Sequence, residues 1–118
     1  DLCNVGGLTE ALKIAHWCET HYIDIAPHNP LGPVSAAACV ALCMSLTNVG
    51  VQEMPKRPGQ YDLDLFPQQI EWENGYAFAL DRPGLGVEID ESVAEDSATK
   101  SGGWPPLLER NDGAFTNW

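Results

Sequence analysis

The sequence is poor in basic residues. Its 118 residues include 6 Lys and Arg against 17 Asp and Glu, which gives a formal net charge of −11 at pH 7. A surface of this sign repels phosphate backbones and anionic lipid headgroups. We therefore expect neither nucleic acid nor a membrane surface as a partner.

Long hydrophobic runs are also missing. No apolar stretch approaches the roughly 20 residues of a membrane-spanning helix. The first residues lack the basic and then apolar pattern of a secretory signal. These two absences predict a cytoplasmic protein.

A regular cysteine framework is absent as well. The four cysteines form no C-x-x-C pair and no ladder typical of a small secreted scaffold, so we expect buried, reduced thiols. They are Cys3, Cys18, Cys39 and Cys43. The carboxylates likewise show no ordered ligand spacing such as an EF-hand loop, and their number indicates a solvated acidic surface.

The first half of the chain alternates helical and extended patterns. The second of the two helices expected there, over residues 35–45, is apolar nearly all round and must be buried on most sides. The alternation predicts parallel strands joined by right-handed crossovers, in an α/β fold. The expected elements are a loop over residues 1–7, a helix capped by Thr9, a strand over 22–26, a helix over 35–45 with Pro33 in its first turn, and a strand over 49–53.

Two parallel strands and two helices form an incomplete sheet with uncovered edges. Either the chain is part of a larger barrel, or a partner supplies the missing strands. From Pro55 onward the sequence turns irregular, and Asn74-Gly75 between apolar-rich runs predicts a β-hairpin of residues 70–72 and 76–80. A helix is expected to start at Asp90.

Three chemically active side chains lie at expected strand ends. Asp1, His28 and Glu53 each occupy such a position, where the reacting groups of βα proteins collect. A carboxylate beside an imidazole fixes its tautomer and stabilises its protonated form, as a base near neutral pH requires. We expect Asp1 to orient His28, and Glu53 to hydrogen-bond a substrate oxygen.

Around these residues the sequence resembles a known family. The runs 1–10, 26–33 and 51–53, the segment 82–90, and the tail from Asp112 to Trp118 are similar to the C-terminal half of the mandelate racemase subgroup of the enolase superfamily. The acid-sugar dehydratases of the galactonate dehydratase type are most similar. The spacing agrees too, with 27 residues from Asp1 to His28 and 25 from His28 to Glu53.

The resemblance implies the C-terminal portion of a (β/α)8, TIM-like barrel, incomplete as it stands, followed by a tail with a β-hairpin. Residues 1–54 are expected to run from the end of strand 6 through strand 8. Residues 55–118 are expected to form the tail, which would pack on the barrel and its capping domain.

The same resemblance implies a lyase reaction on a small sugar acid. His28 is expected to remove the proton α to a carboxylate, with Asp1 orienting it and Glu53 bonding the enediolate oxygen. A bound Mg²⁺ would neutralise the developing charge. Loss of the β-hydroxyl as water would then give a 2-keto-3-deoxy sugar acid.

The resemblance also marks what this chain does not contain. The metal-binding carboxylates of the family lie on earlier barrel strands, so no metal ligand is expected here, and we expect the isolated chain to be inactive. A longer parent, expected to be a homo-oligomer, would carry the activity. Because family tails return toward the barrel mouth, Trp118 is a candidate substrate-binding residue.

Other functions remain open at this point. A gluconate or other aldonate dehydratase, or a racemase of the same superfamily, would use the same three residues. A truncated relic or a partner-binding module would instead use the uncovered sheet edge and the apolar helix for association.

Overall fold

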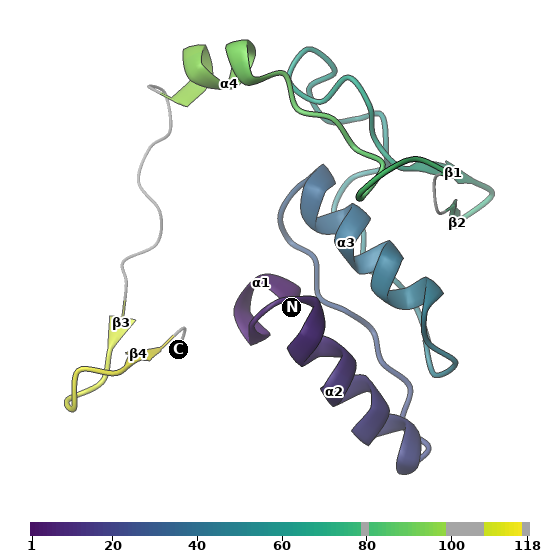
Figure 1. Ribbon diagram of the computed structural model, residues 1–118, viewed down its shortest axis with the longest axis vertical. Helices are drawn as coiled ribbons and strands as arrows, with labels where there is room; N and C mark the ends of the chain where they lie inside the picture. Colours follow the sequence, from purple (N-terminus) through teal and green to yellow (C-terminus); the bar gives the residue numbers. More distant parts are fainter. Residues whose placement is uncertain (79–80, 99–107, 117–118) are drawn as a thin grey trace.

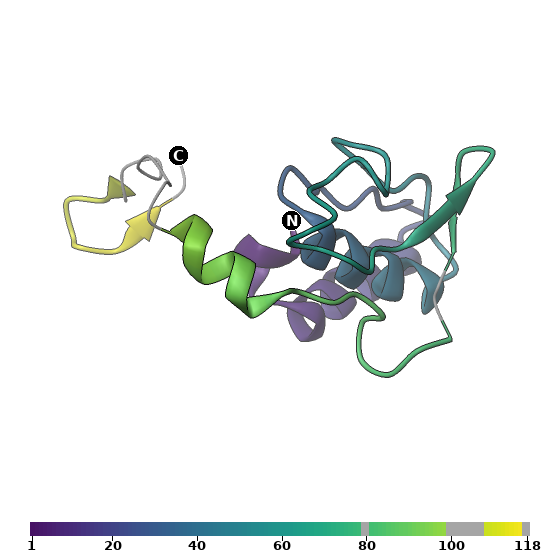
Figure 2. The same ribbon diagram turned by 90° about the horizontal axis from the view of Figure 1, so that it is seen from above.

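The computed structural model describes residues 1–78, 81–98 and 108–116. Helices α1 (Leu2–Val5), α2 (Leu8–Thr20) and α3 (Pro33–Met44) pack together and form most of the core. The later elements are the hairpin β1 (Glu71–Glu73) and β2 (Tyr76–Phe78), helix α4 (Glu91–Ala98), and the hairpin β3 (Leu108–Glu109) and β4 (Phe115–Thr116). In Figures 1 and 2 the β3–β4 hairpin stands apart from the three packed helices.

The loop expected over residues 1–7 is in part a helix, which corrects the sequence prediction. The Asp1 carboxylate accepts a hydrogen bond from the Cys3 backbone N–H at 2.8 Å and caps α1. Gly6 ends the helix in the left-handed conformation at φ 104°, which a residue without Cβ adopts most easily. The next helix, α2, begins one residue before Thr9, with Gly7 at its N-cap.

Helix α3 is buried on two sides, as its nearly uniform apolar sequence predicts. On one side, Cys39 and Leu42 join Leu2 and Ala11 from the first two helices. On the other side, three α3 residues pack against Ile70 before the β1–β2 hairpin, and these are Ala36, Ala37 and Val40. Pro33 is well suited to the first turn of α3, because a backbone N–H at this position has no helical partner and proline lacks one.

The two expected strands pair at a single point. Ile25 and Val49 form a parallel bridge, with hydrogen bonds from Ile25 N to Asn48 O and from Gly50 N to Ile25 O. The predicted parallel direction is therefore right, but continuous strands over 22–26 and 49–53 are not formed. A strand needs hydrogen-bonding neighbours along its length, and this pair has none beyond the bridge in the described part of the chain.

The β1–β2 hairpin confirms its sequence signal. Asn74 and Gly75 turn the chain with positive φ angles of 51° and 85°, as a two-residue type I′ turn requires. The Arg57 guanidinium lies 5.2 Å from the Trp72 ring centroid and fastens the preceding loop to this hairpin.

The helix expected from Asp90 is α4, whose first turn donates two backbone N–H groups to the Asp90 carboxylate. No helix among the described residues has the length and apolarity needed to cross a membrane.

Asn48 ties α2 to the bridge region. Its buried Nδ2 donates to Ala15 O and to Ile23 O, each at 3.0 Å. Asn48→Ala is expected to lower the free energy of unfolding by about 1–3 kcal/mol, because two acceptors lose their donor. Urea denaturation measures this, with the exposed Gln60→Ala as a control that should stay within about 0.5 kcal/mol. An Asn48→Ala effect as small as that of the control would contradict the assignment.

Candidate active site

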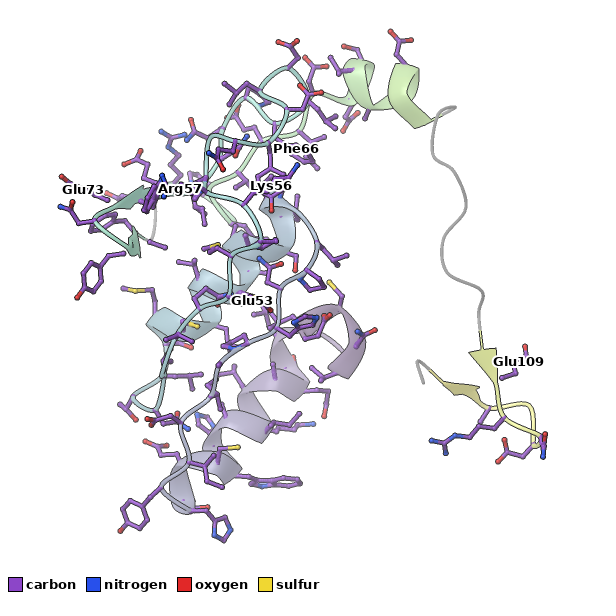
Figure 3. The ribbon with its side chains drawn as sticks, turned by 180° about the vertical axis from the view of Figure 1, so that it is seen from behind. Glu53, Lys56, Arg57, Phe66, Glu73 and Glu109 are labelled. Carbon is purple, nitrogen blue, oxygen red and sulfur yellow. The ribbon has the colours of Figure 1, made fainter. Side chains whose placement is uncertain are left out.

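His28 and Glu53 meet at one edge of the structure. His28 follows the bridge residue Ile25, and Glu53 follows its partner Val49, so the parallel pairing carries both side chains to the same end. The His28 Nδ1 and Glu53 Oε2 atoms lie 2.5 Å apart. Both side chains are about half exposed, at 58% and 48%, and a small molecule can reach them. Figure 3 shows Glu53 near the centre of the helical part, far from Glu73 in the hairpin.

A backbone donor completes the environment of the Glu53 carboxylate. The Asn29 N–H donates to the same Oε2 atom at 2.9 Å. This bond, followed by the hydrogen bond and charge of His28 and the charge of the Asp1 α-amino group, holds the pKa of Glu53 below its ordinary value of 4.5, against an opposing effect of desolvation. Glu53 is therefore an ionised acceptor at neutral pH.

The pairing determines what His28 can do chemically. A carboxylate can only accept, so the Nδ1 atom of His28 carries the donated proton. In a neutral imidazole the Nε2 atom then holds the lone pair. His28 thus presents a general base on Nε2, and Glu53 stabilises the imidazolium that forms when the base takes a proton.

Asp1 is expected beside His28, but its carboxylate caps α1 instead. Its Oδ1 atom accepts from Cys3 N at 2.8 Å, and its Oδ2 atom accepts from Asn4 Nδ2 at 3.1 Å. Asp1 and His28 both belong to the described residues, and no hydrogen bond joins them. The free N–H groups of the first turn of α1 attract the carboxylate. In this structure the carboxylate on the imidazole is therefore that of Glu53.

Two other expectations concern Trp118 and the metal. Trp118 lies outside the described residues. Within the described ranges, no cluster of three or more His, Cys, Asp or Glu side chains has the arrangement of a metal centre. Among the described residues, the hydrogen-bonded carboxylate at His28 is that of Glu53, and these residues do not fit a Mg²⁺ site.

Two residues beside the pair, Asn29 and Gln52, are not among the site residues expected from the sequence. Asn29 follows His28 and Gln52 precedes Glu53. Asn29 is completely buried, and neither polar atom of its side chain has a hydrogen-bond partner among the described residues. The sequence signal for Asn29 and Gln52 is their position next to His28 and Glu53, because neighbouring side chains in an extended chain point to opposite faces.

The thiols of α3 are predicted to be unreactive. Burial raises the pKa of Cys39 and raises the pKa of Cys43 to about 11. A thiol at 11 has about 100-fold less thiolate at pH 8 than one at the ordinary 9.0. Cys3 is exposed, which corrects the expectation of four buried thiols. Iodoacetamide labelling followed by mass spectrometry should therefore modify Cys3 well before Cys43. Equal rates would contradict the burial of this helix face.

Comparison with known proteins identifies the family. The family model described as enolase C-terminal domain-like matches residues 1–93. A D-galactonate dehydratase from Verminephrobacter eiseniae is 36% identical over 125 residues, which is 100% of this chain and 33% of the relative. The chain thus spans about a third of the length of the curated relatives that it matches.

Solved structures agree with this match. An enolase from Agrobacterium radiobacter, with bound sodium and L-malate, has a TM-score of 0.76 and 29% identity over 98% of this chain and 32% of its own. An enolase from Pantoea ananatis, with bound D-gluconate and magnesium, has a TM-score of 0.70 and 33% identity over 80% of this chain and 23% of its own. These matches confirm the predicted C-terminal portion of an enolase-superfamily barrel, and the chain belongs to the enolase C-terminal domain-like family.

Proposed function

We propose that this chain is the proton-transfer part of an acid-sugar dehydratase that acts on D-galactonate or a close relative. One observation carries the proposal: His28 Nδ1 and Glu53 Oε2 lie 2.5 Å apart, just after the two residues of the parallel bridge, and the imidazole Nε2 atom is left as the base. The similarity to D-galactonate dehydratases over the whole chain supports the substrate class.

In the proposed reaction, His28 Nε2 takes the proton from the carbon next to the substrate carboxylate. The electron pair of that C–H bond forms the C=C bond of an enediolate, and the β-hydroxyl then leaves as water with the help of an acid outside this chain. The enol product tautomerises to a 2-keto-3-deoxy sugar acid. A general base such as His28 contributes roughly 10²- to 10⁴-fold to the rate.

Glu53 has two proposed roles in this scheme. Its Oε2 atom accepts from Nδ1 and stabilises protonated His28. The family resemblance adds a hydrogen bond to the enediolate oxygen, for which Oε1 is available because both described bonds fall on Oε2. Oε1 can donate to that oxygen only when it carries a proton, and the lowered pKa of Glu53 opposes this in the resting pair.

The remaining groups are proposed to lie upstream of this chain in a longer parent. We propose that the parent holds Mg²⁺ through carboxylates of that part, and that Asp1 approaches His28 only in its presence. The D-gluconate bound in the Pantoea ananatis relative makes gluconate dehydration the second candidate.

The test uses the protein extended upstream along its reading frame, here named the extended protein. It is incubated with Mg²⁺ and a panel of aldonic acids, and 2-keto-3-deoxy products are measured. Turnover of D-galactonate above the other acids supports the proposal. Preference for D-gluconate supports the second candidate, and the absence of any 2-keto-3-deoxy product contradicts both.

A further inference from the structure

Polar side chains lie behind the His28–Glu53 pair. His28 and Glu53 are about half exposed, whereas their chain neighbours Asn29 and Gln52 are buried and half-buried, respectively. The alternation follows from the extended backbone, which sends successive side chains to opposite faces. Gln52 thus faces α3, on the side away from the exposed carboxylate of Glu53.

The Gln52 carboxamide connects α3 to the backbone of Glu53. The thiol of Cys43, on α3, donates to Gln52 Oε1 at 3.3 Å. Gln52 Nε2 in turn donates to the Glu53 carbonyl oxygen at 2.8 Å. The raised pKa of Cys43 keeps its thiol protonated and able to donate at neutral pH.

The two hydrogen bonds of the Glu53 carboxylate require the Glu53 main chain to be held in place. Its Oε2 atom meets two donors, His28 Nδ1 at 2.5 Å and Asn29 N at 2.9 Å. Glu53 lies outside any regular strand, so neighbouring backbone pairing does not fix it. The Gln52 bond to its carbonyl is the described side-chain contact that fixes its main chain.

We propose that Gln52, held by Cys43, is a positioning residue that fixes the Glu53 main chain and thereby sets the tautomer of His28. Gln52 acts through Glu53 and touches no substrate. The proposal rests on the proposed function for its kinetic consequence, but the tautomer can be measured without turnover. A displacement of about 1 Å at a reacting group can cost about 100-fold in rate.

The main variant is Gln52→Met in the extended protein, which keeps the side-chain length and removes both hydrogen bonds. We expect kcat to fall by about 10- to 100-fold with KM unchanged. In the 118-residue chain, where Asp1 caps α1 and Glu53 is the carboxylate on His28, we also expect the ¹⁵N shifts of neutral His28 to change from a single tautomer with the proton on Nδ1 to a mixture. The matched control is Gln68→Met, because half-buried Gln68 makes the same kind of bond to the carbonyl of Gln69, away from the pair.

A second pair of variants tests the Cys43 contact independently. Cys43→Ser keeps a donor for Gln52 Oε1 and is expected to retain kcat and the His28 spectrum. Cys43→Ala removes the donor. It is expected to lower kcat and to mix the His28 tautomers, as Gln52→Met does. If Gln52→Met fails to fold, the comparison of Cys43→Ser with Cys43→Ala decides whether Gln52 is a positioning residue.

The outcomes separate the two proposals. A mixed His28 tautomer in Gln52→Met supports positioning even if the extended protein turns over no sugar acid. An unchanged His28 spectrum and an unchanged kcat, with only the free energy of unfolding lowered, would show a merely structural role and overturn the inference. Equal behaviour of Cys43→Ser and Cys43→Ala would overturn the part assigned to the thiol.

Discussion

Replacing His28 with Asn in the extended protein is expected to lower kcat for D-galactonate by about 10²- to 10⁴-fold. Asn is close to His in size and polarity, but its amide nitrogen has no basic lone pair to take a proton. The product assay measures the loss directly. His28 is more than half exposed, so the substitution should cost little in stability.

His16→Asn is the matched control for this variant. His16 lies on the outer face of α2 and is also exposed. We expect it to keep the parental kcat and KM. If His28→Asn retained more than about a tenth of the parental kcat, His28 would not be the base.

Glu53→Gln is expected to reduce kcat by about 100-fold. The glutamine oxygen can still accept from His28 Nδ1, so the tautomer is preserved while the negative charge that stabilises the imidazolium is lost. The loss should therefore fall on kcat and hardly on KM. A variant with an unchanged kcat would show that the short contact has no part in proton transfer.

The same variant tests the electrostatics of the pair. Because the folded-state pKa of Glu53 is lowered, its contacts stabilise the protein above its ordinary value of 4.5, and this contribution is lost as pH falls through the lowered pKa. Glu53→Gln cannot titrate, so it should show a flatter decline of stability in acid. Urea midpoints measured above and below pH 4.5 check this, and identical acid profiles would contradict it.

Local signals predict helices α2, α3 and α4 and the first hairpin well. The apolar periodicity of α2, the apolar sequence of α3 and the Asn74-Gly75 turn all depend on neighbours within a few residues. Helix α1 was missed because four residues give no periodicity. Only the Asp1 cap and the left-handed Gly6 mark it.

The strands could be predicted only in part. Their direction follows from the alternation of elements, but their length depends on hydrogen-bonding neighbours that the chain sequence does not supply. Between these two segments one bridge, Ile25 with Val49, forms in the described residues. It is enough to bring His28 and Glu53 to one edge, as their positions after the strands indicated.

The finer geometry of the site could not be predicted from residue types. Nothing in the sequence decides whether Asp1 bonds to His28 or caps α1, because both are ordinary uses of a carboxylate. The Asn29 contribution comes from a backbone N–H, which every residue but proline has. The Gln52 contacts depend on how α3 packs, which is a tertiary property.

The most direct test of the account is a paired assay of this 118-residue chain and the extended protein with D-galactonate and Mg²⁺. We predict 2-keto-3-deoxygalactonate from the extended protein alone, because this chain supplies His28 and Glu53 but no metal centre among its described residues. Product from the 118-residue chain at a comparable rate would contradict the central claim that it carries only the proton-transfer part of the site.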